Sequence, residues 1–160
     1  MSKELAYIWR YSDEEEWARR IARSEMPPLI ITAALTGGFH GKEANPNLPE
    51  QPREIIDAAY DCWKAGASIV HIHARDKNGV PTGDPEVYRE INEGIRERCG
   101  DLIIQNTTGG GPGMTVEERI RPIEADPDMI SLNMGTMMST WKGEEFLFSN
   151  KLSELEYIAN

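Results

Sequence analysis

Short apolar runs alternate with amphipathic helical segments along this chain, and that alternation constrains the fold more than any other feature. Four runs have the length and composition of buried strands: 29–35, 67–74, 102–106 and 129–133. Helical patterns separate or follow these runs, and they open at Pro52, Asp84-Pro85, the capping pair Thr115 and Glu118, and Leu152. Four strand–helix units in succession predict a parallel sheet covered by helices.

Two architectures fit this order, a doubly wound open sheet and a (β/α)₈ TIM barrel. Both place function at the carboxyl edge of the sheet. A complete barrel needs roughly 250 residues, and the chain has 160. As a barrel, residues 28–160 are expected to supply about the first four βα units, the N-terminal half of a catalytic domain. Residues 1–27 are expected to form an extension, with a short helix that opens at Ser12 and Glu15 and ends before Pro27-Pro28.

Charge and composition exclude several classes of partner. The formal net charge of −10 argues against a nucleic-acid or anionic membrane surface. The apolar run at 29–35 is too short to span a bilayer, and the charged N-terminus lacks the apolar core of a signal peptide. Cys62 and Cys99 lack metal-type spacing and are expected to be buried or half-buried thiols. A cytoplasmic location is the expectation.

The sharpest local motif is His71-Ile72-His73, at the end of the second predicted strand. Residues two apart on a strand share a face, so both imidazoles converge while Val70 and Ile72 face the helix layer. Such a pair suits Zn²⁺, although two hydrogen-bonded core histidines would give the same pattern. A catalytic zinc usually has three protein ligands. His40 is a candidate third ligand by residue type, but a loop exposed to solvent is its expected place, and a carboxylate from elsewhere is favoured.

A glycine-rich loop at 105–113, QNTTGGGPG, follows the third predicted strand directly. Consecutive backbone N–H groups and threonine hydroxyls can form an anion-binding nest. The loop matches neither a Walker A motif nor a dinucleotide fingerprint, and glycine-rich loops mostly make turns. Beside two histidines at the same sheet edge, it predicts a site that holds a carboxylate.

Polar residues also follow the second and fourth predicted strands. Arg75, next to Asp76, could pair with a substrate carboxylate or form a structural ion pair with a neighbouring loop. Ser131 and Asn133 share one face of the fourth strand. Strand-end hydrogen bonding is the simpler interpretation of these two.

Five motifs, taken together and in order, resemble the β-keto acid cleavage enzymes: LIITAALTGG, NPNLP, AGASIVHIHARD, IIQNTTGGG and MISLNMGT. The resemblance runs from about Pro28 to Ser149. It implies a TIM barrel, usually assembled as a homo-oligomer. The implied reaction is an exchange in which a β-keto acid and acetyl-CoA give acetoacetate and a new CoA thioester.

The resemblance also implies roles for particular residues. His71 and His73 match zinc ligands, and the zinc would polarise the keto acid. Thr107, Gly110 and Ser131 match positions that hold the substrate.

Two departures from the family pattern shape the expectation. Phe39 aligns with a family glutamate that binds the amino group of an aminohexanoate substrate. A phenylalanine cannot pair with an ammonium, so a less polar substrate is favoured. The family's third zinc ligand, a glutamate, and its catalytic aspartate and arginine come from later strands. The chain is therefore expected to be a fragment, a truncated product, or one half of a site assembled in trans.

Two other functions remain open on the residues alone. One is a metal-dependent hydrolase that uses the HxH motif on the same barrel. The other is a catalytically inactive fragment or assembly subunit, whose open sheet edges are covered by a partner.

Overall fold

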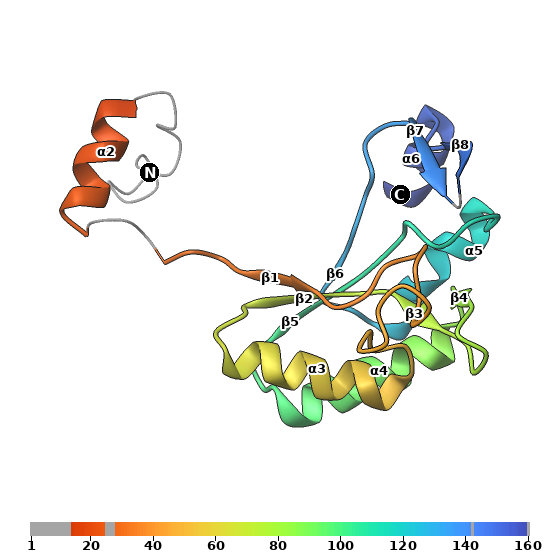
Figure 1. Ribbon diagram of the computed structural model, residues 1–160, viewed down its shortest axis with the longest axis horizontal. Coiled ribbons are helices and arrows are strands. Elements are labelled where there is room, and N and C mark those ends of the chain that lie inside the picture. The colour runs from red at the N-terminus through yellow and green to blue at the C-terminus, as the bar shows by residue number, and fades with distance from the viewer. Residues whose placement is uncertain (1–13, 25–27, 142, 160) are drawn as a thin grey trace.

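The computed structural model describes residues 14–24, 28–141 and 143–159. At its centre lies a parallel four-stranded sheet in the order β1-β2-β5-β6 (Figure 1). Its strands are β1 (Thr32–Ala34), β2 (Ile69–Ile72), β5 (Ile103–Asn106) and β6 (Met129–Ile130). The predicted parallel sheet is thus confirmed, although each strand is shorter than the apolar run that predicted it.

Two long helices, α3 (Pro52–Lys64) and α4 (Pro85–Arg98), lie together on one face of this sheet (Figure 1). The spatial order of the strands follows their order in the chain, without a reversal. A doubly wound sheet reverses its strand order and places helices on both faces. The sequential strand order, with α3 and α4 on one face, therefore differs from a doubly wound sheet and is TIM-barrel-like.

The core fills the space between the sheet and the helices. Strand residues alternate, so that Val70, Ile72 and Ile104 are fully buried while their neighbours point to the other face. Helix residues cover them: Ile55, Ala59, Ile91 and Ile95. The expected orientation of Val70 and Ile72 is confirmed. Cys99 is buried and Cys62 half-buried, as expected.

Sequence signals set the helix ends. Pro52 and the capping pair Gln51 and Glu54 open α3. Gly66, at φ +103°, closes it, and the amides of Gly66 and Ala67 donate to the carbonyls of Trp63 and Cys62. This is the Schellman pattern, which satisfies carbonyls that a helix end leaves unpaired.

The later helices begin and end where the sequence predicted. Asp84 accepts from the Glu86 amide at the start of α4. Thr115 and Glu118 cap α5 (Val116–Ile120) reciprocally. Pro122 lies at the start of the 3₁₀ segment η1 (Arg121–Ala125), because proline cannot donate the next helical hydrogen bond. The tail forms α6 (Leu152–Ala159).

Two antiparallel pairs were absent from the predicted elements. β3 (Ala74–Arg75) pairs with β4 (Pro81–Thr82) directly after the histidine motif. β7 (Met137–Trp141) pairs with β8 (Glu144–Phe148), and Gly143 at φ +82° lies in their turn. The predicted strand 129–133 was too long, because β6 ends at Ile130 and the chain leaves the sheet to form this hairpin.

The N-terminal helix α2 (Glu14–Ala22) stands apart from the sheet and its helices (Figure 1). A helix was expected in this extension, and its predicted cap Ser12 lies outside the described residues. Across the described ranges, no helix combines the length and the apolar character needed to cross a bilayer.

A hydrogen bond to Tyr88 links α4 to the backbone directly after the histidine motif. Its buried hydroxyl accepts a hydrogen bond from the Ala74 amide at 3.1 Å, one residue after His73. Tyr88→Phe leaves that buried amide unpaired, so the free energy of unfolding should fall by about 1–3 kcal/mol. Urea unfolding measures it, with Tyr157→Phe as the control because Tyr157 is half exposed. Equal stability of both variants would contradict this account.

Candidate functional site

The register of the parallel strands brings the predicted site residues together. Ala34, His71, Gln105 and Met129 lie side by side across the four strands. Two residues further toward the carboxyl end of each strand, the corresponding positions are Thr36, His73, Thr107 and Ser131. Backbone bonds from Thr107 N to Ile72 O and from Ser131 N to Asn106 O continue the ladder there. We call Thr36, His73, Thr107 and Ser131 the carboxyl-edge row.

The two motif histidines lie against each other at this edge. Their ring centroids are 5.1 Å apart and the rings meet edge to face. Both side chains therefore lie on the same side of the sheet, as the HxH spacing predicted. The His71 Nδ1 atom lies 2.8 Å from Gln105 Oε1. As a donor to that oxygen, Nδ1 carries the proton and leaves Nε2 with a lone pair, which is the form that a metal requires.

His73 is held neutral by its surroundings. Burial, together with smaller effects of the nearby His71 and Arg75, lowers the pKa of its imidazole to about 4. A neutral imidazole has a lone pair for a metal at neutral pH. Within the described ranges, no group of three histidine, cysteine, aspartate or glutamate side chains gathers around a metal-sized space. The site thus brings together two imidazoles, and His40 stays exposed in its loop.

The glycine-rich loop uses most of its amides internally. The Thr108 amide donates to Ser131 Oγ at 3.1 Å, and the Gly109 amide donates to Thr107 Oγ1 at 2.9 Å. The Gly111 amide contacts the Met114 sulfur at 3.1 Å. An open nest of consecutive free amides, as the sequence suggested, is therefore not what the loop presents.

The hydroxyl groups of Thr107 and Ser131, rather than the amides of the glycine-rich loop, are the available hydrogen-bond donors at this edge. Thr107 and Ser131 each accept a backbone N–H on the hydroxyl oxygen, so each hydroxyl hydrogen is left to donate. Both side chains belong to the carboxyl-edge row. Two hydroxyl donors beside the two imidazoles form a site suited to an oxyanion.

Arg75 binds neighbouring loops through backbone carbonyls rather than through the ion pair that the sequence suggested. Its guanidinium is buried and donates to the backbone carbonyls of Gly37, His40 and Gly79. Among the described residues it forms no salt bridge with a carboxylate. Arg75 therefore fixes the loop that follows β1 against the loop that follows β3.

Two loops touch closely above the sheet. Gly38 lies against the Gly110 carbonyl, so near that a β-carbon on residue 38 would overlap it. Gly110 itself has φ +63°, which glycine adopts at no steric cost. The loop after β1 and the glycine-rich loop can meet only because both positions lack a side chain.

A cavity of about 420 Å³ lies between the glycine-rich loop and the β7–β8 hairpin. Phe39 and Phe146 form part of its wall, with ring centroids 5.4 Å apart. Gly109 lines it and lies next to the histidines, since a β-carbon there would be 3.9 Å from His73 Cε1. The cavity therefore adjoins the carboxyl-edge row, and much of its wall is apolar.

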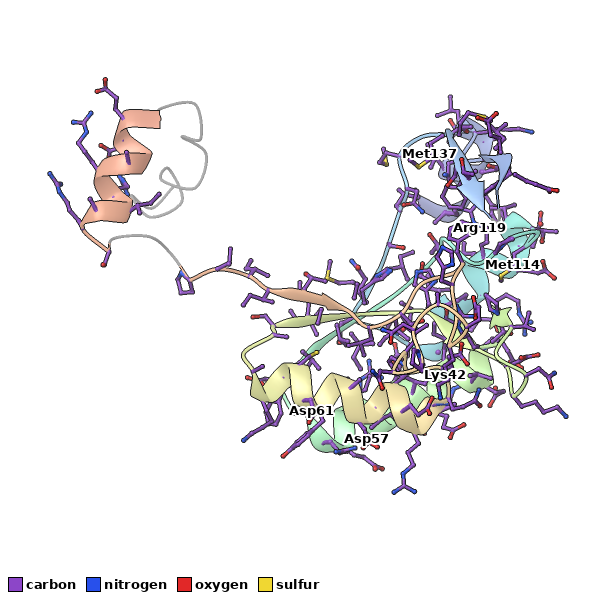
Figure 2. All side chains as sticks on the ribbon, in the orientation of Figure 1. Lys42, Asp57, Asp61, Met114, Arg119 and Met137 are labelled. Atoms are coloured by element: carbon purple, nitrogen blue, oxygen red, sulfur yellow. The ribbon has the colours of Figure 1, made fainter. Side chains whose placement is uncertain are left out.

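Arg119 links two walls of this cavity. It is buried and donates to Thr108 O in the glycine-rich loop, to Ser149 O, and to Asn150 Oδ1 at the base of the hairpin. Its guanidinium also lies over the Phe148 ring at 5.2 Å. Figure 2 shows Arg119 where α5 approaches the hairpin. One side chain thus sets the distance between two walls of the cavity.

Known proteins are similar to this chain in sequence and in fold. The family model for the beta-keto acid cleavage enzyme matches residues 28–160. The chain belongs to the beta-keto acid cleavage enzyme family. The 3-keto-5-aminohexanoate cleavage enzyme of Fusobacterium nucleatum is 50% identical over 111 residues, 69% of this chain and 41% of the relative. The 3,5-dioxohexanoate:acetyl-CoA acetone transferase of Paraburkholderia graminis is 39% identical, over 81% of this chain and 49% of the relative.

The chain spans less than half of the length of both relatives. A solved structure, the ternary complex of ObcA with a C4-CoA adduct and oxalate, matches it with a TM-score of 0.57. That match has 19% identity and covers 70% of this chain and 28% of the other. This beta-keto acid cleavage enzyme family member therefore has a TIM-barrel-like α/β fold.

Sequence reasoning missed three contributors to the site. Phe146 belongs to a hairpin that the strand pattern did not reveal. Arg119 was hidden because an arginine on a short amphipathic helix is typically solvated. Thr36 is a single polar residue after the first predicted strand, which is a weak signal, although burial and register place it level with His73. The alternating apolar residues at Phe146 and Phe148 were the one available signal for the hairpin.

The pKa of His73 predicts a pH dependence of stability in the metal-free protein. The folded-state pKa of about 4 lies below the ordinary value of 6.5, so the unfolded chain binds the proton more tightly. The stabilising contribution is complete above pH 6.5 and is lost as pH falls toward 4, by about 2–3 kcal/mol. Urea unfolding across this range should show that His73→Gln reduces the slope, whereas exposed His40→Gln keeps it. An unchanged slope in His73→Gln would refute the assignment.

Removing the Arg119 guanidinium should loosen both cavity walls. Arg119→Met leaves three buried acceptors without a donor, and the free energy of unfolding should fall by about 2–4 kcal/mol. Hydrogen exchange should accelerate in β7, β8 and residues 107–111 before it does in α3. Arg96→Met is the matched control, because Arg96 also donates to a backbone carbonyl, that of Asp126, but is exposed. Uniform acceleration in both variants would show that Arg119 has no special role.

Proposed function

We propose that this chain carries part of the active site of a zinc-dependent β-keto acid cleavage enzyme that uses acetyl-CoA. On this proposal, residues 28–160 supply about the first four βα units of a (β/α)₈ barrel, and residues 1–27 precede the barrel. The observation that carries the proposal is the carboxyl-edge row beside His71. It combines two imidazoles and two hydroxyl donors at the edge where barrels of this kind hold their ligands.

The proposed reaction is an exchange between two carbonyl compounds. The bond between the keto carbon and the α-carbon of the β-keto acid breaks, and the acyl group is transferred to the sulfur of CoA. The two-carbon unit that carries the carboxylate forms a new bond to the acetyl carbon of acetyl-CoA. The products are acetoacetate and a new CoA thioester, so no oxidant, reductant or water is consumed.

His71 and His73 would hold the zinc ion. The residues present fit this role, because both imidazoles lie on one face, Gln105 orients one and burial keeps the other neutral. A bound zinc supplies a Lewis acid for the keto acid. Its third protein ligand would be a carboxylate beyond the described residues, since the described ranges bring no third candidate to the pair.

Thr107, Gly110 and Ser131 would hold the substrate carboxylate. The two hydroxyl hydrogens point away from the amides that their oxygens already accept. Two fixed donors orient a carboxylate, and the reacting carbons next to it are then held in a repeatable position.

The end of the substrate distant from the carboxylate would be apolar. Phe39 and Phe146 line the cavity together with the carboxylates of Glu144, Glu145 and Glu154. Phe39 stands where the resemblance puts a glutamate that binds the amino group of 3-keto-5-aminohexanoate, and a phenylalanine cannot pair with an ammonium, so a β-keto acid with a less polar end is favoured.

A homo-oligomer is part of the proposal. The outer strands β1 and β6 have one neighbour each within the described sheet, and the sheet exposes Ile103 of β5 and Met129 of β6. Strand edges and apolar faces of this kind need a covering surface.

Replacement of either motif histidine should remove zinc and turnover together. In the active enzyme that contains this chain, His71→Ala or His73→Ala should reduce bound zinc and CoA-thioester formation at least tenfold, because two remaining ligands hold a catalytic metal poorly. Metal analysis and a thioester-exchange assay measure both losses. His40→Ala, a change in an exposed loop, should retain both.

The same assay separates the alternatives. Release of the acid by water without a CoA thioester would indicate a metal-dependent hydrolase instead. Full zinc content in the double variant His71→Ala/His73→Ala would contradict the proposed metal site.

A further inference from the structure

Thr36 carries a buried hydroxyl without a hydrogen-bond partner. The side chain is 8% exposed, and Thr36 Oγ1 makes no hydrogen bond among the described residues. A buried hydroxyl in that condition costs about 1–3 kcal/mol relative to one that is satisfied. Its presence therefore needs an explanation other than stability.

Other buried polar groups of the chain differ from Thr36. Asn92 and Asn106 each have an unpaired Oδ1, but their amide nitrogens donate to the backbone at Ala125 and Pro122. Arg75 has an unpaired Nε, yet its other nitrogens make three bonds. These side chains tie structural elements together, whereas the Thr36 hydroxyl ties nothing.

The position of Thr36 directs it toward the site. Leu35 packs against the core on the helix side of the sheet, so its successor turns to the inner face. Ala34 pairs with His71, which places Thr36 level with His73 in the carboxyl-edge row. The next residues of the chain reach the glycine-rich loop, where Gly38 meets Gly110.

We propose that Thr36 is a ligand-contacting residue, whose hydroxyl donates a hydrogen bond to an oxygen of a bound β-keto acid. The proposal rests on the proposed function, since it names a further contact of the same site. A neutral hydroxyl is not among the usual zinc ligands, which are thiolate, imidazole and carboxylate. With Thr107 and Ser131, Thr36 gives the row three hydroxyl donors from three different strand ends.

Thr36→Val separates a ligand contact from a structural role. Valine keeps the size and branching of threonine and removes only the unpaired hydroxyl. In the active enzyme that contains this chain, the melting temperature should stay constant or rise, while the affinity for acetoacetate in the presence of Zn²⁺ should fall about tenfold or more. Thr36→Ser retains the hydroxyl and should bind acetoacetate within about threefold of the unmodified chain.

Thr32→Val is the matched control. Thr32 lies on the same strand and the same face, but it is exposed and level with Ile69 rather than with His73. Its replacement should leave acetoacetate affinity unchanged. Calorimetric titration gives the affinities, and differential scanning calorimetry gives the melting temperatures.

The binding and melting results distinguish failure of the Thr36 contact from failure of the proposed function. Equal affinity in Thr36→Val and the unmodified chain overturns the Thr36 contact and leaves the proposed function standing. A lower melting temperature with unchanged affinity would show that the hydroxyl only anchors a buried water, which also overturns the contact. If the active enzyme that contains this chain, loaded with Zn²⁺, binds no acetoacetate, the proposed function fails and the Thr36 contact fails with it.

Discussion

The parallel hydrogen-bond ladder between β1, β2, β5 and β6 is the constraint on which the site depends. Side chains alternate between the two faces of a strand, so a slip of one residue would exchange buried Val70 and Ile72 with the histidines. Burial of those apolar residues against α3 and α4 therefore fixes the register. The same register assembles His73, Thr107 and Ser131 from three strand ends, although they are far apart in the chain.

Two buried arginines give the site a rigid and positively charged frame. Arg75 and Arg119 donate mainly to backbone carbonyls, and neither forms an ion pair within 4.0 Å among the described residues. Carbonyls satisfy the N–H groups, while carboxylates further away partly offset the charges, because Glu43 interacts electrostatically with Arg75 and Glu154 with Arg119. In a chain with a net charge of −10, the two guanidiniums still place positive charge close to the site.

Local signals in the sequence predicted the sheet, the helix caps and the histidine pair, because each depends on neighbouring residues. Gly66, Asp84 and Thr115 act within one helical turn, and HxH alternation acts within one strand. The partners of Arg119 and the β7–β8 hairpin depend on contacts 30 residues or more away or on a turn with a weak signal. The burial of Thr36 depends likewise on where the loops above it cross, which no local pattern records.

The crossing of Gly38 over Gly110 has a consequence for evolution and engineering. Phe39 lines the cavity, while its neighbour at 38 tolerates no side chain without displacing the Gly110 carbonyl. Position 39 can therefore accept different side chains, whereas the adjacent position 38 requires glycine. A library that randomises position 39 alone varies the cavity wall and keeps the scaffold intact. In a library that randomises both positions, most variants would carry a side chain at position 38, and their two loops could not meet.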